Sequence, residues 1–191
     1  MITGILLAAG KSSRFGSQKL LARLPNAGGQ RVIEASAANL LAAVGRVIAV
    51  TSRDDMLMRV LDDCGCQVVV NEHSANGMGT SIAAGVNASM DAAGWIIALG
   101  DMPYLHVETI ASVRQYLSEQ YHIVVPMYQG KRGHPVGFAR QYSSVLGALQ
   151  GDAGARSIID AALAENASNI FQFNIDDAGV VADIDVPADL Q

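Results

Sequence analysis

The sequence predicts an α/β protein, a single domain with a doubly wound, mainly parallel sheet and helices on both faces. Short apolar runs alternate along the chain with stretches of helical periodicity. Strands joined through helices require right-handed crossovers, which give a largely parallel sheet with both faces covered. The 191 residues correspond to about one domain, and no linker, repeat or charge block divides residues 1–191.

Each expected element follows from its local pattern. The expected strands are short and rich in apolar and β-branched residues: Ile2–Ala8, Val47–Thr51, Gln67–Val70, Trp95–Leu99, His122–Pro126, Val136–Ala139, Ile170–Asn174 and Val180–Asp185. The expected helices repeat apolar residues three or four positions apart: Arg31–Val44, Asp54–Asp63, Thr80–Ala93, Val107–Gln120, Tyr142–Leu149 and Ala155–Ala164. We expect a last helical turn to open at Pro187, because proline suits the first position of a helix.

Composition excludes several classes of protein. With 13 Lys and Arg against 18 Asp and Glu, the net charge is −5, which argues against nucleic-acid binding because such proteins need a basic surface. No apolar run is long enough to cross a membrane. The apolar start lacks the basic region of a signal peptide, so we expect a cytoplasmic protein. Cys64 and Cys66 are too close for an easy disulfide and read as small apolar residues of a turn.

The strongest local signal follows the first strand, where residues 7–20 read LAAGKSSRFGSQKL. Glycines allow a sharp turn and a close approach to a ligand, and successive backbone N–H groups can then bind an anion. Arg14 and Lys19 add positive charge suited to a polyphosphate. A P-loop would need glycine where Ile5 stands, and the spacing of Gly10 and Gly16 does not fit the dinucleotide fingerprint. We therefore expect a phosphate loop of another kind, with a solvated turn as the alternative.

Carboxylates follow two of the expected strands. Asp101 comes directly after Trp95–Leu99, at the edge where such sheets bind ligands. Mg²⁺ prefers oxygen ligands and often binds through one or two carboxylates together with substrate phosphates. Asp183 and Asp185 are two residues apart, so on a strand both would face the same side. Either could be the second metal ligand, and the sequence leaves that choice open.

Three further loops contain polar residues. Asn71 ends the third expected strand and either binds a base or ribose or serves as a turn residue. Ser81 lies in a Gly-rich segment before a helix, where it can cap the helix or help its N-terminus to meet an anion. His134 lies in a tight, basic turn between two strands. The adjacent Asp176 and Asp177 are expected in a solvated loop.

Taken together, the motifs resemble the signature of the MobA-like nucleotidyltransferases, which include the molybdenum cofactor cytidylyltransferases. The matching segments are LAAGxSSRxGxxK at 7–19, Asn71, GMGTS at 77–81, GDMP at 100–103, GHP at 133–135, GDxGAR at 151–156 and DIDVP at 183–187. The resemblance implies a Rossmann-like nucleotidyltransferase fold. It also implies transfer of a nucleotidyl group from a nucleoside triphosphate to a phosphorylated acceptor, with release of pyrophosphate.

The resemblance also implies roles for individual residues. It places the triphosphate on the first loop, at Leu7, Ala8, Ala9, Gly10, Ser12, Ser13 and Lys19, and it places the base near Asn71, Gly79 and Ser81. Arg14, Lys19 and Asp101 are the implied catalytic residues, and Asp101 with Asp183 or Asp185 is the implied Mg²⁺ site. His134 is implied on the acceptor side. Gln18 departs from the family pattern, because many relatives have proline there, and we expect a less rigid loop.

The substrates follow from the resemblance alone. Ala8-Ala9 before Gly10 resembles the cytidylyl enzymes and indicates CTP. Molybdopterin is the expected acceptor, and methylerythritol phosphate is the alternative. A catalytically inactive nucleotide-binding regulator is a second alternative, from a different functional class.

Overall fold

The computed structural model describes residues 1–10, 15, 18–25, 27–119, 121–152 and 154–190. An eight-stranded mixed sheet forms its centre, in the order β3-β2-β1-β4-β7-β5-β6, with β8 paired to β5. The strands are β1 Ile2–Ala8, β2 Val47–Thr51, β3 Gln67–Val70, β4 Gly94–Leu99, β5 Ile123–Tyr128, β6 Lys131–Arg132, β7 Val136–Ala139 and β8 Ile170–Asn174. Strand β7 runs antiparallel to β4 and β5, whereas β3, β2, β1 and β4 are mutually parallel. The predicted α/β class is confirmed.

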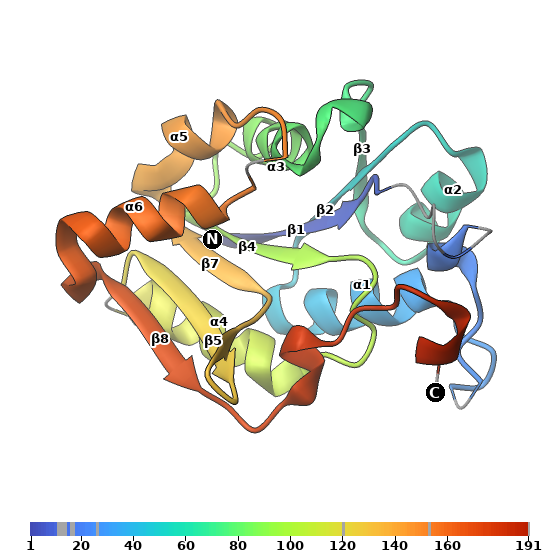
Figure 1. Ribbon diagram of the computed structural model, residues 1–191. Coiled ribbons are helices and arrows are strands. Elements are labelled where there is room, and N and C mark those ends of the chain that lie inside the picture. The colour runs from blue at the N-terminus through green and yellow to red at the C-terminus, as the bar shows by residue number, and fades with distance from the viewer. Residues whose placement is uncertain (11–14, 16–17, 26, 120, 153, 191) are drawn as a thin grey trace.

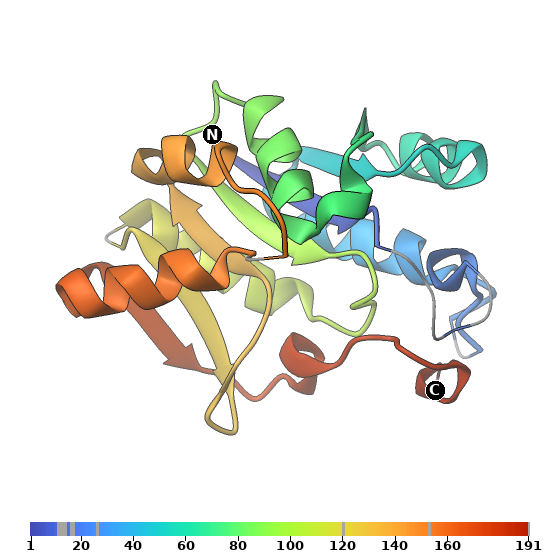
Figure 2. The ribbon, with the colours of Figure 1, turned by 45° about the horizontal axis from the view of Figure 1, so that its top comes forward.

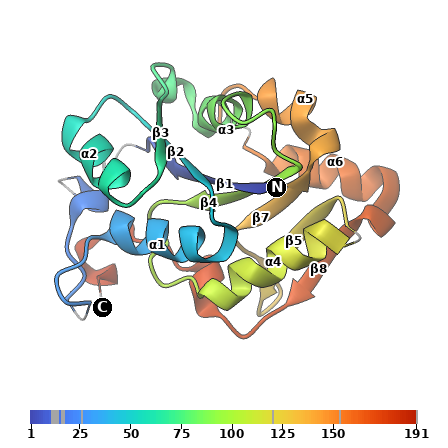
Figure 3. The same cartoon turned by 180° about the vertical axis from the view of Figure 1, so that it is seen from behind.

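Helices cover both faces of the sheet (Figures 1 and 3). They are α1 Val32–Val44, α2 Asp55–Asp63, α3 Met78–Asn87, α4 Val107–Glu119, α5 Ser143–Gly147 and α6 Arg156–Asn166. Alternate side chains of β1 pack to opposite sides. Leu6 belongs to the core beneath α1, α2 and α4, and Ile5 belongs to the core beneath α3, α5 and α6. The two-residue period of a strand therefore produces two separate hydrophobic layers.

Two helices are markedly shorter than the sequence predicts, and the bounds of the other four described helices agree with prediction within two residues. Helix α3 begins at Met78 and ends at Asn87, because the chain then turns through Ser89, whose hydroxyl donates to the Gly85 carbonyl and accepts from the Trp95 indole. Helix α5 is confined to Ser143–Gly147 and follows a 3₁₀ turn at Arg140–Tyr142.

The predicted strand Val180–Asp185 is wrong. Residues Ala178–Val181 form a 3₁₀ turn, and residues 182–186 are irregular. The backbone here bonds to loops instead of a neighbouring strand, since the Val180 carbonyl accepts from the His134 N–H and the Ile184 N–H donates to the Asp101 carbonyl. The pattern of alternating apolar residues was genuine, because Val180 and Ile184 are both buried.

Asp177 also departs from the sequence prediction of a solvated loop, whereas its neighbour Asp176 is exposed. The Asp177 side chain is 1% exposed. Its carboxylate accepts from the Thr109 hydroxyl at 2.6 Å, the His106 N–H at 3.1 Å and the Gly179 N–H at 2.9 Å. It therefore ties the start of α4 to the C-terminal segment, residues 175–190.

The sheet topology gathers several loops at one edge. Because β1 to β4 run parallel, their carboxyl ends lie together there. After β8, the C-terminal segment crosses back towards this edge, and its end lies beside the chain that follows β1 (Figures 1 and 2). None of the described helices combines the length and apolar character needed to cross a membrane.

Candidate active site

Three distant parts of the sequence meet at Lys19. This residue opens a 3₁₀ turn, Lys19–Leu21, just after the Gly-rich loop. Its Nζ donates to Asp101 Oδ2 at 2.7 Å and to Asp185 Oδ1 at 3.4 Å. The Lys19 and Asp101 side chains are mostly buried, with 12% and 19% exposed, whereas 43% of the Asp185 side chain is exposed. A single cation is thus held between a carboxylate after β4 and one in the C-terminal segment.

The surroundings keep Lys19 charged. Burial favours the neutral amine and lowers the pKa of Lys19, but the hydrogen bonds and negative charges of Asp101 and Asp185 act in the other direction. The balance raises the pKa of Lys19 above its usual value. Lys19 is therefore an ammonium throughout the neutral pH range.

Backbone contacts bring Asp101 to this position. The Gly100 N–H donates to the Leu7 carbonyl at 2.9 Å, so the end of β4 lies against the start of the first loop. A Cβ at Gly100 would lie 2.8 Å from Ile33 Cδ1 and 3.0 Å from the Leu7 carbonyl oxygen. Glycine is needed for this close approach. In the sequence Gly100 is only part of the GDMP motif at 100–103, and its value as a spacer becomes visible in the packing.

The two candidates for the second carboxylate have different surroundings. Asp185 contacts Lys19, whereas the exposed Asp183 lines a surface pocket. Within the described part of the chain, no three His, Cys, Asp or Glu side chains cluster as a metal site. Asp101 and Asp185 nevertheless offer oxygen donors that converge on one cationic group. This donor set suits a hard divalent ion that takes its other ligands from phosphates and water.

The described part of the first loop comprises both of its ends and the half-buried Phe15. Ala8 is buried, while Gly10 is exposed, with no atom within 4 Å of the position a Cβ would take. Ser12, Ser13 and Arg14 lie outside the described residues. The expected effect of Gln18 is offset in part, because Gln18 Nε2 donates to Asp54 Oδ2 at 3.0 Å and so ties the loop to the start of α2.

The Asn71 side chain forms hydrogen bonds within the protein. Its amide nitrogen donates to Thr80 Oγ1 at 2.9 Å and to Ser81 Oγ at 3.0 Å, and its amide oxygen accepts from the His73 N–H at 2.9 Å. Asn71 and Ser81 are both buried. This network fixes the turn after β3 against α3. In these contacts Asn71 acts as a turn residue, which is one of the two alternatives that the sequence left open.

The N-terminus of α3 packs against another loop. The Gly79 N–H donates to the Gly151 carbonyl at 2.9 Å. A Cβ on Gly79 would lie 2.9 Å from two carbonyl oxygens, those of Gln150 and Gly151. The expectation that this N-terminus meets an anion therefore does not extend to the Gly79 N–H, which is directed at a protein carbonyl.

Comparison with known proteins identifies the family of the chain. The chain matches the MobA-like NTP transferase domain over residues 4–167. The chain belongs to this family. Its C-terminal segment, which supplies Asp185, lies beyond the matched region.

Individual relatives of this MobA-like protein have diverse names. Nicotine blue oxidoreductase of Paenarthrobacter nicotinovorans is 30% identical over 163 residues, which cover 81% of this chain and 79% of that protein. The crystal structure of Rv0371c from Mycobacterium tuberculosis H37Rv is 27% identical, with a TM-score of 0.81, and covers 98% of this chain and 94% of that one. A complex of Rv0371c with manganese is 25% identical, with a TM-score of 0.73, and the coverage is 98% and 95%.

His134 faces the same region of the MobA-like domain. Burial lowers the pKa of His134, whereas a hydrogen bond to the Ile97 backbone and the charges of Asp101 and Asp183 act to raise it. The net effect is a lowered pKa, so the imidazole is neutral at neutral pH. Its Nδ1 is buried and has no hydrogen-bond partner among the described residues.

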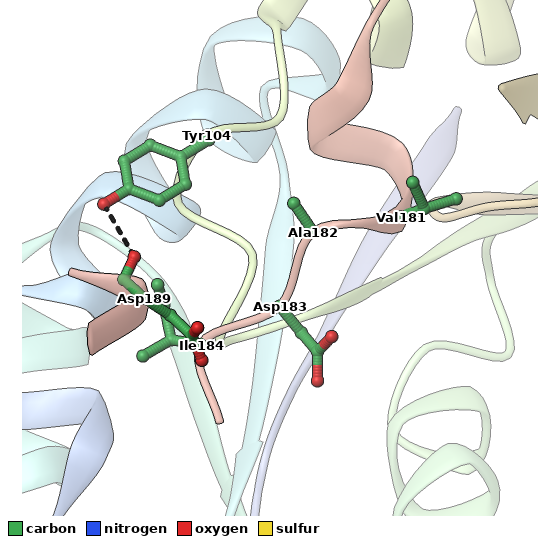
Figure 4. Close-up of a pocket in the computed structure, with 6 residues that line it drawn as sticks. All are labelled: Tyr104, Val181, Ala182, Asp183, Ile184 and Asp189. Carbon is green, nitrogen blue, oxygen red and sulfur yellow. Dashed lines mark hydrogen bonds between the residues drawn. The ribbon is translucent and has the colours of Figure 1, made fainter. Parts of the chain in front are cut away.

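A pocket of about 530 Å³ opens beside the carboxylates of Asp183 and Asp189. Figure 4 shows its lining, in which the Tyr104 ring lies beside Asp189, and Val181, Ala182 and Asp183 lie across from them. The lining residues are Tyr104, Val181, Ala182, Asp183, Ile184 and Asp189. Neither Tyr104 nor Asp189 belongs to a motif of the sequence, and their place next to Asp183 and Asp185 is visible only in the structure.

Proposed function

We propose that this MobA-like protein transfers a nucleotidyl group, CMP from CTP, to the terminal phosphate of a small organic acceptor, with molybdopterin as that acceptor. The observation that carries the proposal is the position of Lys19 between Asp101 and Asp185 at the ligand-binding edge of the sheet. The family match supports the reaction type. The choice of CTP rests on the Ala8-Ala9-Gly10 sequence, and the choice of acceptor rests on family resemblance.

The reaction forms one phosphorus–oxygen bond and breaks another. An oxygen of the acceptor phosphate attacks the α-phosphorus, and pyrophosphate leaves with the bridging oxygen between the α- and β-phosphorus atoms. A phosphate monoester has a second pKa of about 6, so the attacking group is already ionised and needs no strong general base. Lys19 and Arg14 stabilise the charge that develops on the departing pyrophosphate. The raised pKa of Lys19 ensures that it can do so.

Asp101 and Asp185 are the residues that would hold a Mg²⁺ ion, with Asp183 close by. When bound, this ion neutralises phosphate charge and orients the α-phosphate. Their oxygen donors fit such an ion, and the manganese complex of Rv0371c supports divalent-metal use in a relative. With such an ion held by the two carboxylates, Lys19 would exchange its bonds to them for bonds to the triphosphate.

The remaining loops complete the proposed site. Leu7, Ala8, Ala9, Gly10, Ser12 and Ser13 hold the triphosphate through the first loop. Asn71, Gly79 and Ser81 shape the base-binding side, with Asn71 acting through the turn that it fixes. His134 lies on the acceptor side, and the pocket beside Tyr104 gives the organic part of the acceptor a place next to the carboxylates.

A pyrophosphate-release assay tests the proposal. The purified protein is supplied with Mg²⁺, each of the four nucleoside triphosphates, and either molybdopterin or methylerythritol phosphate. We expect release with CTP and molybdopterin, and loss of release in Asp101→Asn. Release of pyrophosphate with methylerythritol phosphate but not with molybdopterin would show that methylerythritol phosphate is the acceptor. Binding of a nucleotide by calorimetry without release, for either acceptor, would favour a regulator.

The Paenarthrobacter relative supplies the second candidate function, oxidoreduction. The protein is therefore also incubated with nicotine blue and with nicotinamide and flavin cofactors. The absorbance of nicotine blue is then followed over time. We expect no change. Turnover of nicotine blue that survives Lys19→Ala, with no pyrophosphate release in any mixture, would overturn nucleotidyl transfer.

A further inference from the structure

The turn that carries Asp185 is fixed by a side chain from its own far end. Asp189 lies in the 3₁₀ turn Pro187–Asp189, and one of its oxygens, Oδ2, accepts from the backbone N–H groups of both Asp185 and Val186 at 2.8 Å. The Ile184 N–H just before them donates to the Asp101 carbonyl at 2.9 Å. Three consecutive amide groups around Asp185 are therefore bound, and Asp189 binds two of them.

Packing contributes little on the C-terminal side of this turn. Ile184 is 1% exposed and anchors the chain before Asp185, but Val186 is 40% exposed, and Pro187 and Ala188 are exposed as well. The Asp189 main chain is secured separately, since its carbonyl accepts from the Tyr104 hydroxyl at 3.4 Å (Figure 4). Hydrogen bonds to the Asp189 carboxylate therefore hold the backbone conformation here, where apolar burial does not.

One oxygen of the Asp189 side chain thus accepts from both amides, and a neutral carbonyl oxygen in the same place could accept from them as well.

We propose that Asp189 is a positioning residue for nucleotidyl transfer: by binding the amides of residues 185 and 186, it directs the Asp185 carboxylate at the Lys19–Asp101 pair. In this role Asp189 acts through Asp185 and not on the reacting atoms. This inference rests on the proposed function. It separates two roles for Asp189, a hydrogen-bond acceptor that shapes the turn and a charge that acts directly on the site.

Two substitutions separate these roles. Asp189→Ala removes the acceptor and the charge, whereas Asp189→Asn removes the charge but keeps a carbonyl oxygen that can accept both amides, and Asn equals Asp as a capping residue. In Asp189→Ala we expect hydrogen exchange at the amides of residues 185 and 186 to quicken about tenfold and kcat to fall about tenfold, with KM for the nucleotide within about threefold. Asp189→Asn restores all three values. Asp91→Ala is the control, because Asp91 is an exposed carboxylate paired with Arg46 on the surface.

A double substitution tests whether Asp189 acts through Asp185. Asp185→Asn with Asp189→Ala should have the same kcat as Asp185→Asn alone, because residues that act as a unit are not additive. The inference is overturned if exchange at 185 and 186 is unchanged in Asp189→Ala, if exchange quickens while kcat stays at the wild-type value, or if Asp189→Asn loses as much activity as Asp189→Ala. Absence of transfer by the wild-type protein with every nucleotide is a different result, which removes the proposed function itself.

Discussion

At the scale of single residues, Lys19 does more than add a charge to a phosphate loop. It hydrogen-bonds to two carboxylates that would otherwise repel one another, at 2.7 and 3.4 Å. Removing its ammonium therefore changes both the proposed phosphate subsite and the environment of Asp101 and Asp185. Both effects should reduce transfer more than binding.

We expect Lys19→Ala to lower kcat/KM at least ~100-fold, the usual effect of losing one well-placed group that stabilises transition-state charge. Steady-state pyrophosphate release measures this loss. Arg46→Ala removes a surface cation paired with Asp91 and should leave the rate unchanged. Wild-type activity in Lys19→Ala would exclude this residue from the chemistry.

Asp177 shows a different use of a carboxylate. It is buried and accepts three hydrogen bonds that join α4 to the C-terminal segment. We expect Asp177→Ala to lower the free energy of unfolding by about 3 kcal/mol, because buried donors lose their partner. The exposed neighbour Asp176→Ala should change it by less than about 0.5 kcal/mol. Urea denaturation measures both, and equal losses would contradict the structural role of Asp177.

At the scale of elements, the entry to α3 depends on close packing with the loop at 150–152. Gly77 has φ +107°, and a Cβ there would collide with the Gly151 backbone and approach Asp152 Oδ1 to 2.5 Å. Side chains rarely adopt that backbone conformation, and here the space is also filled.

The comparison with another glycine separates strain from collision. Gly45, at the end of α1, has φ +76° with no atom near a Cβ, so Gly45→Ala should cost only about 1 kcal/mol of strain. We expect Gly77→Ala to cost at least about 3 kcal/mol, since the loop must also move. Thermal unfolding of the two variants tests this difference, and similar melting temperatures would contradict it.

Helix α2 provides a pH-dependent contribution to stability. The backbone N–H of Leu57, and then the Gln18 side chain, hold the pKa of Asp54 below its usual value. The stabilising effect of the carboxylate is therefore complete above the unfolded pKa of about 3.9 and is lost as the pH falls through the lower folded value.

We expect Asp54→Ala to lower the free energy of unfolding by about 1 kcal/mol at pH 7, as for other N-cap losses. Below about pH 4, the free energies of unfolding of wild type and Asp54→Ala should become more similar. Asp62→Ala, at the exposed C-terminal end of the same helix, is the control. Urea titrations at several pH values provide the measurement, and a difference independent of pH would show that the charge of Asp54 is not responsible.

At the scale of the whole molecule, the site is closed by the chain returning to its start. The Lys19–Asp101 contact joins residues 82 apart in sequence, and the Lys19–Asp185 contact joins residues 166 apart. The C-terminal segment lies beyond the matched family domain, yet it contributes a carboxylate to the site. Ligand binding should therefore stabilise the entire chain.

We expect CTP with Mg²⁺ at about 100 times Kd to raise the free energy of unfolding by about 2.7 kcal/mol. A chelator should remove most of this gain. Without a divalent ion, the negative charges of Asp101 and Asp185 repel the triphosphate. Asp101→Asn is the matched variant, and it should show a reduced gain. Thermal denaturation with and without the chelator measures the effect, and an equal gain in both would contradict the proposed metal site.

Local pattern was sufficient for most of the sheet. The bounds of β1, β2, β3, β7 and β8 equal those expected from sequence, because β-branched and aromatic residues in short runs between turns favour strands. The same pattern misled at 180–185, where Val180 and Ile184 alternate as in a strand but their backbone groups bond to loops. Periodicity reports which side chains are buried, and it does not report which backbone partner is available.

The sequence by itself determined the alternation of strands and helices, the two apolar layers, and the candidate residues Lys19, Asp101 and the 183–185 pair. Only the tertiary structure decided that Asp185 is the carboxylate that contacts Lys19, that Asp177 is buried as a cap, and that Asp189 fixes the turn beside Asp185. The reason is that periodicity and residue type are properties of neighbouring positions, whereas these contacts depend on how distant loops meet at the edge of the sheet.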